Sequence, residues 1–382
     1  MRLSDNGPLG LLEIVDRRAG FIRRRENSYL ANPGDIHVGQ SLIQRFGLRT
    51  GDQIAGAVDG RAQRGRSPSL GRITELNGKP PQDLLRRPEF NRLSAIHPDT
   101  RLVLECGRML RDQPDPTNRI VDLLCPFGKG QRALIVSPSK AGKTTVLQAI
   151  AEGVSKNYPE AVLLILLVDE RPEEVTEMQD CGFGEVIASS FDFPPDRHAA
   201  VAEITLERAR RRVESGDDVV LILDSITRLA RAYNSTERSS GRTLSGGLDS
   251  NAMERPKRFF GSARAVDPGQ GGGSMTIIST ALVDTGSQMD QVIFEEFKGT
   301  GNSELVLSRE LAERRMYPAI DISASATRRE ELLLPPDELA ASRALRRKLA
   351  GRDPAVAMEQ LLSILRGSPS NAALVKAMTE RS

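Results

Sequence analysis

Tryptophan is absent from the 382 residues of this chain, and aromatic side chains make up only 4% of them. The three cysteines are scattered without a Cys-x-x-Cys spacing and there are only three histidines, which excludes a disulfide framework and a zinc cluster. The longest apolar run, AVLLILLV at 161–168, is too short to cross a membrane. The first residues, MRLSDNGPLG, lack the apolar core of a secretory signal. These absences predict a protein of the reducing cytoplasm with no membrane partner.

The composition is otherwise ordinary for a globular protein, with 39% hydrophobic and 27% charged residues. At this length it predicts two or three domains with an ample buried core. The net charge of +2 conceals a basic excess within residues 1–115 and a slight acidic excess after them. Such an excess is typical of contact with a polyanion, and it also occurs on ordinary solvated surfaces. The arginines of Arg17-Arg18 and Arg23-Arg24-Arg25, which flank Gly20-Phe21-Ile22, favour the polyanion.

Residues 11 to about 105 contain short apolar stretches, among them LLEIV, GFIR, DIHV, QIAGAV, GRITEL and RLVLE, separated by turn-rich segments. This pattern predicts a small all-β domain. The stretch GRAQRGRSPS at 60–69 has no large apolar residue and predicts a mobile basic loop. RDQPDPT at 111–117 has the prolines and acids of an interdomain linker. We therefore expect one domain at 1–110, a linker at 111–120 and a second domain at 121–382.

The second domain has the alternation of apolar strands and longer helical patterns that a mostly parallel α/β sheet requires. Strands are expected at 133–136, 161–168, 218–223 and 274–283. Helices are expected near 142, and at 197–214, 337–349 and 354–366.

A phosphate-binding P-loop lies between the first of these strands and its helix. The segment Ser137 to Thr144, SPSKAGKT, fits the P-loop pattern with serine in place of the first glycine. Backbone N–H groups at a helix N-terminus hold phosphate oxygens, Lys143 reaches the β- and γ-phosphates, and the Thr144 hydroxyl binds magnesium. The predicted nucleotide-binding set in this loop is Ser139, Lys140, Ala141, Gly142, Lys143, Thr144 and Thr145.

Two acidic residues follow buried strands, where a P-loop ATPase needs them. Asp224, at the end of VVLILD, is the expected Walker B carboxylate that holds magnesium. Glu170, in LLVDERPEEVTE, is a candidate for orienting or deprotonating the attacking water. Only one of Asp169 and Glu170 can point at the nucleotide. The alternative for Glu170 is an ordinary acidic residue at a helix N-terminus beside Pro172.

Longer stretches resemble the transcription termination factor Rho family: DERPEEVTEMQ at 169–179, LDSITRLARAYN at 223–234, RPKRFFGSAR at 255–264 and DTGSQMDQVIFEEFKGTGN at 284–302. PAID and TRREELL further on extend the resemblance over nearly the whole chain. It implies a RecA-like α/β P-loop ATPase domain preceded by a small all-β OB-fold (cold-shock-like) domain. It also implies a homohexameric, RNA-stimulated ATPase and helicase with ATP and Mg²⁺ as cofactors. The implied partners are single-stranded RNA and RNA polymerase or the transcription elongation complex.

The resemblance assigns roles to residues that spacing alone does not identify. Glu170 matches the catalytic glutamate, and Lys143 and Asp224 match the residues of the P-loop and the Walker B strand. Arg171 and Arg228 fall on motif positions near the nucleotide. Arg328, in SATRREE, matches an arginine finger that a neighbouring subunit inserts, and Arg315 matches a second arginine at the subunit interface.

The matches to RNA-binding segments include departures. SSGRTLSGGLDSNA at 239–252, with Arg242 and Ser245, resembles the glycine-rich pore loop called the Q loop, although its composition also suits a surface linker. Gln288 stands in the second pore loop, the R loop, where lysine is usual.

In the β domain Phe21, Arg23 and His37 match RNA-contacting positions, while Ala19 replaces an aromatic residue and His37 a tyrosine. Phe21 is equally compatible with a place in the core. The helical subdomain that begins full-length members is expected to be mostly absent.

Three hypotheses follow from the sequence. The first is a hexameric ATPase that pulls RNA through its centre and terminates transcription. The second is a Rho paralogue with a regulatory role, and the third is a nucleotide-switched RNA-binding protein with little turnover. The intact Lys143, Glu170, Asp224 and Arg328 argue against the third. A rotary ATP synthase β-type subunit would share the RecA-like core, but the stretch DERPEEVTE and the pore-loop matches disfavour it.

Overall fold

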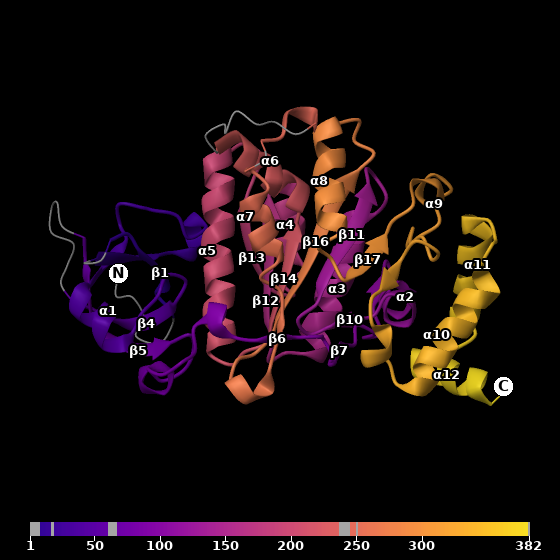
Figure 1. Ribbon diagram of the computed structural model, residues 1–382, viewed down its shortest axis with the longest axis horizontal. Coiled ribbons are helices and arrows are strands. Elements are labelled where there is room, and N and C mark those ends of the chain that lie inside the picture. Colours follow the sequence, from indigo (N-terminus) through magenta and orange to yellow (C-terminus); the bar gives the residue numbers. More distant parts are fainter. Residues whose placement is uncertain (1–7, 17–18, 60–66, 237–244, 250, 381–382) are drawn as a thin grey trace.

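The computed structural model describes residues 8–16, 19–59, 67–236, 245–249 and 251–380. A β-barrel lies at one end of the molecule, a mostly parallel sheet flanked by helices forms the middle, and three C-terminal helices lie at the other end (Figure 1). Among the described residues no helix combines the length and the apolar character needed to cross a bilayer.

The barrel is closed by five strands in the order β1-β2-β3-β5-β4. Alternate residues such as Leu12, Ile22 and Ile36 point inward and are buried, as the period of two along a strand requires. The short helix α1 (Gln40–Phe46) lies beside β2 and β3. The strands are β1 (Gly10–Ile14), β2 (Ala19–Arg23), β3 (Ile36–Gly39), β4 (Gln53–Asp59) and β5 (Ser69–Leu76).

After the last strand of the barrel ends at Leu76, the chain forms a series of short strands beside the helix-flanked sheet. β6 (Ala95–Ile96) pairs with β15 (Ala265–Val266), and β7 (Arg101–Leu102) pairs with β10 (Phe127–Gly128). The stretch RLVLE, expected as a strand of the β domain, therefore begins with a strand of a separate two-stranded sheet. The hairpin β8 (Met109–Leu110) and β9 (Gln113–Pro114), followed by helix α2 (Thr117–Leu124), occupies most of the segment expected as a linker.

The central sheet has seven strands in the order β13-β12-β14-β16-β11-β17-β18, all parallel except the last pair. The expected strands and helices are present within one or two residues of their predicted ends. The strands are β11 (Arg132–Pro138), β12 (Val162–Val168), β13 (Glu185–Ser189), β14 (Val219–Asp224), β16 (Met275–Val283), β17 (Ser303–Val306) and β18 (Ala326–Thr327).

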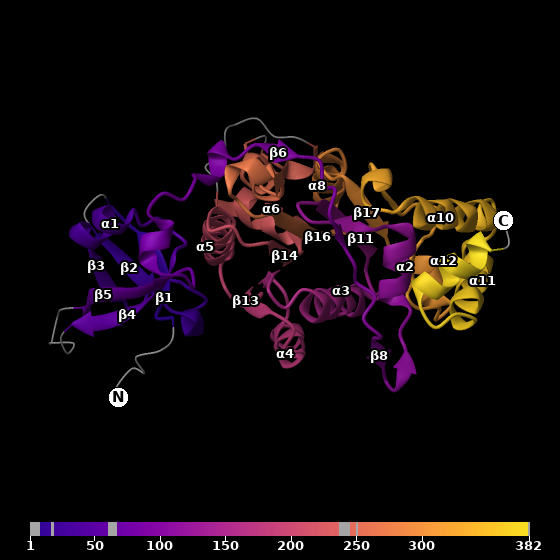
Figure 2. The same ribbon diagram turned by 90° about the horizontal axis from the view of Figure 1, so that it is seen from below.

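Helices cover both faces of this sheet, with α3 and α4 on one side and α6 and α8 on the other (Figure 2). The helices of this region are α3 (Lys143–Asn157), α4 (Pro172–Asp180), α5 (Pro195–Glu214), α6 (Ile226–Thr236), α7 (Glu254–Phe260), α8 (Gln288–Lys298), α9 (Arg309–Glu313), α10 (Pro336–Leu349), α11 (Pro354–Arg366) and α12 (Asn371–Thr379).

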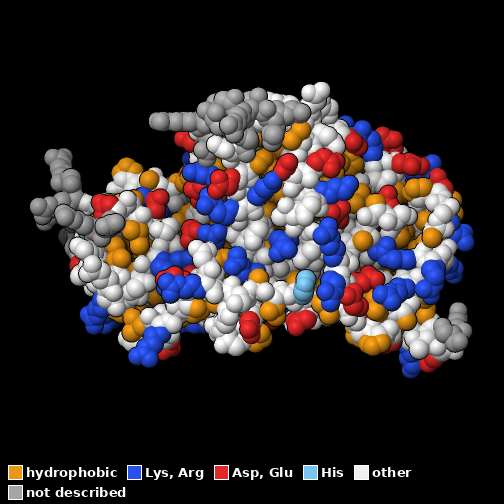
Figure 3. All heavy atoms as spheres, in the orientation of Figure 1, with side chains coloured by type: hydrophobic (Ala, Val, Ile, Leu, Met, Phe, Trp, Pro, Cys, Tyr) orange, Lys and Arg blue, Asp and Glu red, His pale blue; other side chains and the backbone are white. Residues whose placement is uncertain are grey.

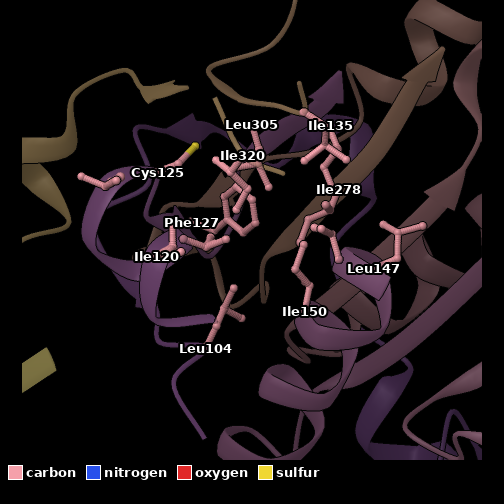
Figure 4. Packing of buried hydrophobic residues seen from close by; sticks show 14 of the residues in the cluster. Leu104, Ile120, Cys125, Phe127, Ile135, Leu147, Ile150, Ile278, Leu305 and Ile320 are labelled. Atoms are coloured by element: carbon pink, nitrogen blue, oxygen red, sulfur yellow. The ribbon is translucent and has the colours of Figure 1, made fainter. Parts of the chain in front are cut away.

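The hydrophobic core holds the P-loop strand rigidly between its neighbours. Ile135 of β11 and Ile278 of β16 pack against Leu147 and Ile150 of α3 (Figure 4). Because β-branched and leucine side chains at these positions are fully buried, the strand end from which the P-loop starts is fixed by close packing.

The barrel is attached to α5 by polar contacts. Arg208 of α5 is paired with Glu185 at 2.6 Å, and Tyr29 of the barrel donates a hydrogen bond to the same carboxylate. Gly51 has a φ of +92°, and a Cβ there would lie 2.4 Å from the backbone carbon of Glu207, so only glycine allows this approach. The barrel therefore has a defined position on the helix.

Candidate functional site

The predicted P-loop connects β11 to α3. Lys140 and Gly142 have φ angles of 65° and 86°, which turn the backbone around the loop and start α3 at Lys143. Backbone N–H groups at the start of a helix point outward and carry partial positive charge. Ser139 to Thr145 thus lead into a helix N-terminus of the kind at which phosphate groups bind in proteins.

Lys143 connects the three strands of the predicted site. Its Nζ donates a hydrogen bond to Asp224 Oδ1 at 2.7 Å and another to Glu170 Oε1 at 2.8 Å. Thr280 of β16 donates to Asp224 Oδ1 at 2.6 Å. Both carboxylates are buried, Glu170 with 2% and Asp224 with 3% of its surface exposed. The sequence did not single out Thr280, whose contact follows from the neighbouring positions of β14 and β16.

Burial shapes the electrostatics of this group. Burial and the nearby charge of Asp224 raise the pKa of Glu170 to about 8. Burial opposes the charge of Lys143, but the carboxylates of Asp224 and Glu170 outweigh it and raise the pKa of the ammonium. A carboxyl group with a pKa near neutrality is suited to accept a proton.

Arg228 fixes the loop that carries Glu170. Its guanidinium donates to the backbone carbonyl of Asp169, lies 3.3 Å from the Asp169 carboxylate and lies 3.4 Å from Glu170 Oε1. Asp169 therefore pairs with Arg228. Of the two neighbouring acidic residues, Glu170 is the one that points at Lys143. The exposed Arg171 occupies the N-cap position of α4 without a side-chain hydrogen bond to the helix, and it lies outside this cluster.

A hollow of about 600 Å³ adjoins the P-loop, and its aromatic wall is a feature that the sequence patterns do not reveal. Tyr317, which is 45% exposed, lines it together with Arg315, Gly142 and the 110–117 segment. The Tyr317 ring lies 3.5 Å from the position that a Cβ on Gly142 would take. An exposed aromatic followed by proline, in a chain so poor in aromatics, was the signal that could have identified it.

Arg328 lies far from the P-loop of its own chain. It follows β18, whose Thr327 pairs with Ser303, and Ser303 pairs with Ala133 at the start of β11. The P-loop leaves the other end of β11, five residues later, or roughly 16 Å along a strand. The exposed Arg328 therefore cannot act at the P-loop of its own subunit.

In the barrel, Phe21 and His37 form a pair across β2 and β3. Their ring centroids are 5.7 Å apart and edge-to-face, and both residues lie half-buried on the outer surface, outside the core. Arg23 has only 7% of its surface exposed and is paired with Asp35 at 2.6 Å and with Glu13 at 2.5 Å. Its charge is thus neutralised within the barrel, and its guanidinium lies 5.3 Å from the Phe21 ring centroid.

The described part of the first pore-loop match, at 245–249, lies beside the start of the second, at Gln288. Ser245 begins a short turn at 245–247, and a Cβ on Gly246 would lie 2.6 Å from the backbone N of Met289, directly after Gln288. Gln288 begins α8 and borders an open hollow together with Arg231 and Gly246. Arg242 lies outside the described residues.

Two family models match the chain. Residues 9–82 match the model described as Rho termination factor, RNA-binding domain. Residues 117–327 match the model described as ATP synthase alpha/beta family, nucleotide-binding domain. The first match argues against a rotary ATP synthase subunit, because it adds an RNA-binding domain to the shared nucleotide-binding fold.

Known structures and sequences agree with these matches. The solved structure of an ATPase from a bacterial type III secretion system superimposes with a TM-score of 0.62 at 22% identity, covering 84% of this chain and 93% of that one, which supports the fold.

A transcription termination factor Rho from Gemmatimonas aurantiaca is 57% identical over 94% of this chain, which spans 48% of that protein. Those of Chromobacterium violaceum and Buchnera aphidicola are 50% and 52% identical over 97% and 95% of the chain, which spans 87% and 85% of their lengths. The chain therefore belongs to the transcription termination factor Rho family, in which it joins an RNA-binding domain to the nucleotide-binding domain of an ATPase.

Proposed function

We propose that this chain assembles into a homohexameric ring that hydrolyses ATP and pulls single-stranded RNA through its centre, terminating transcription. The observation that carries the proposal is the position of Lys143 between Glu170 and Asp224 at the start of α3. RNA polymerase in its elongation complex would be the assembly that this motor dissociates, and the cytoplasm would be its compartment.

The contacts of Lys143 suggest how hydrolysis begins. When ATP binds, its phosphates attract the Lys143 ammonium away from the two carboxylates with which it is paired. Glu170 is then free to orient a water molecule and accept its proton. Arg228 keeps the backbone beside Glu170 in place, since it bonds the carbonyl of Asp169. Tyr317 would contact the nucleoside part in the adjoining hollow, and Arg315, which the resemblance assigns to a subunit interface, lines the same hollow and would contact the phosphates there.

The oxygen donors present fit Mg²⁺. Among the described residues both hydrogen bonds to the Asp224 side chain use Oδ1, so Oδ2 can face a cation, and Thr144 follows directly after Lys143. One carboxylate and one hydroxyl, completed by phosphate oxygens and water, is a typical Mg²⁺ environment. The ion would neutralise charge on the phosphates during transfer.

The RNA path is proposed to include the pore segments and the barrel. Ser245, Arg242 and Gln288 would contact RNA in the centre of the ring. Because Gln288 replaces the usual lysine, the RNA path has one positive charge fewer at this position. Phe21 and His37 would capture RNA first, since exposed aromatic faces stack on bases of any sequence.

The decisive experiment measures ATP hydrolysis with and without single-stranded, pyrimidine-rich RNA in the presence of Mg²⁺. Turnover that rises severalfold or more with RNA supports the motor. High ATP affinity with little turnover would instead favour the nucleotide-switched binding protein. Stimulated turnover without release of transcripts from a stalled elongation complex would favour the regulatory paralogue, which the missing R-loop lysine at Gln288 makes worth testing.

RNA capture by the barrel is expected to be weak and strongly dependent on salt. Phe21→Leu should lower the affinity of the full chain for short oligonucleotides roughly tenfold, since one stacked base contributes about 1–3 kcal/mol. The remaining affinity should fall steeply with salt because phosphate neutralisation supplies it. Phe46→Leu, at a half-buried aromatic of α1, is the matched control. Equal affinity of the Phe21 and Phe46 variants, measured by fluorescence anisotropy at several salt concentrations, would remove Phe21 from the site.

A further inference from the structure

A row of arginines crosses the face of the molecule that carries α5 and α7. We define the arginine band as Arg132, Arg210, Arg258, Arg264 and Arg328. Basic side chains are spread across the middle of this face (Figure 3). The P-loop helix α3 and helix α4 lie on the other side of the sheet (Figure 2).

Backbone contacts place the members of the band beside one another. The backbone N–H of Arg328 donates to the Asn302 carbonyl, and that of Arg132 donates to the Asn302 side chain at 2.8 Å. The Arg132 guanidinium then reaches the carbonyl of Ala263, directly before Arg264, at 3.1 Å. These contacts place Arg328, the proposed finger, and Arg132 beside one another, and Arg132 beside the segment that leads from α7 to Arg264.

The far end of the band surrounds a hollow. Arg264 lies 4.3 Å and Arg210 lies 5.4 Å from the ring centroid of Phe90, so two guanidinium groups share one aromatic ring. Together with Arg258 they line a hollow of about 450 Å³ between α5, α6 and α7. Glu203 and Glu207 border the same hollow and balance part of the charge. An anionic group entering here would meet several converging donors.

The concentration of charge is unfavourable in the isolated chain. Burial and the nearby Arg210 and Arg132 lower the pKa of Arg264, and burial and Arg328 lower the pKa of Arg132. Arg210 pairs with Glu207 at 2.6 Å, whereas within the described residues no carboxylate forms an ion pair with the other four arginines of the band. A negatively charged partner would relieve this repulsion.

The opposite face supplies a matching surface. Helix α4 has the sequence PEEVTEMQD, with four acidic residues and no basic one. Glu173 and Glu177 are exposed and one turn apart, so they lie on the same side of the helix. The helix starts two residues after Glu170, so this acidic surface borders the ATP site.

A head-to-tail ring brings these two faces together, because a heterologous contact joins different surfaces of identical subunits. We propose that the arginine band of one subunit receives the acidic helix α4 of the next copy of this chain, aligning Arg328 with the neighbouring ATP site. The inference rests on the proposed ring and deepens it by naming the surfaces that meet. It predicts that ring assembly weakens with salt, which screens such charges.

Charge reversal tests the docking. Arg258→Glu in one chain and Glu173→Lys/Glu177→Lys in another should each require about tenfold more protein for ring assembly, since like charges then face each other. Assembly is followed by analytical ultracentrifugation with ATP and Mg²⁺, and nucleotide binding by each variant is measured separately. An equal mixture of the two variants should assemble like the unaltered chain, because in an alternating ring every interface again joins opposite charges.

Matched controls are Arg347→Glu on α10 and Glu160→Lys after α3, both exposed and outside the two surfaces. They should leave assembly unchanged. The proposal is overturned if the reversed variants assemble like the controls, or if their mixture is not rescued. Normal assembly combined with lost RNA binding by Arg258→Glu would assign the band to RNA instead. If the unaltered chain itself fails to form rings, the proposed function fails first, and the two failures remain distinct.

Discussion

Replacing Glu170 by glutamine should reduce ATP turnover by roughly 10²–10⁴-fold while leaving ATP affinity nearly unchanged. Glutamine keeps the shape of the side chain and its contact with Lys143 but cannot accept a proton from water. Lys143→Ala should abolish turnover and also weaken ATP binding, because the ammonium contacts the phosphates before and during the reaction. Steady-state turnover and equilibrium binding of a fluorescent ATP analogue distinguish the two defects.

The carboxyl group of Glu170 should also determine how ATP hydrolysis depends on pH. Because burial and Asp224 raise the pKa of Glu170 to about 8, the share of molecules in which this carboxyl is ionised and can act as a base increases as the pH rises through that value. The value of kcat/KM, which reports the free enzyme, should therefore rise as the pH is increased toward 8 and level off above it.

Lys156→Ala, in the last turn of the same helix α3, serves as the control for the lysine variant. Its side chain is exposed and pairs with Glu152, away from the P-loop. It should keep the turnover and the pH profile of the unaltered chain. A Glu170→Gln protein with undiminished turnover would show that another group activates the water.

The P-loop could be predicted from sequence because its chemistry resides in consecutive residues between a strand and a helix. Asp224 and Glu170 were also predictable, since the carboxyl ends of parallel strands meet at one edge of a sheet. The choice between a helix-end charge and a catalytic role for Glu170 needed the structure. Its burial against Lys143, two residues before α4 begins, favours the catalytic role.

Contacts between segments far apart in the sequence could not be predicted from sequence patterns. The wall of the hollow beside the P-loop joins Tyr317 to the 110–117 segment, whose prolines and acids resemble those of a linker. β7 has the apolar pattern of a barrel strand, yet it pairs with β10 beside the central sheet. Arg23 matches an RNA-contacting position by sequence, which stays a prediction, and only the structure shows that Asp35 and Glu13 pair with its guanidinium. In each case the environment of the residue or strand depends on a contact with a segment distant in the sequence, and the sequence alone does not identify that segment.

Arg328→Ala should bind ATP normally and yet lose roughly 10³–10⁵-fold in turnover, the effect expected for an arginine that stabilises the transferring phosphate. The start of β11, beside which Arg328 lies, is separated from the P-loop by the length of the strand, so its target must belong to a neighbouring subunit. Arg329→Ala is the matched control, because Arg329 is adjacent in sequence but pairs with Glu331 at 2.7 Å within its own chain.

Mixing provides the sharper test of action between subunits. Arg328→Ala chains have an intact P-loop, and Lys143→Ala chains have an intact finger, so neither protein alone hydrolyses ATP. In a random equal mixture about one quarter of the interfaces pair the intact P-loop of one chain with the intact finger of the next. Turnover should therefore reappear on mixing and be highest near the equal ratio, at which interfaces of this kind are most frequent. Two results would contradict the assignment: full activity of Arg328→Ala protein alone, and full activity of an isolated monomer of the unaltered chain. A finger that acts only between subunits cannot supply its charge to the phosphate bound by its own chain, so a single subunit should be inactive.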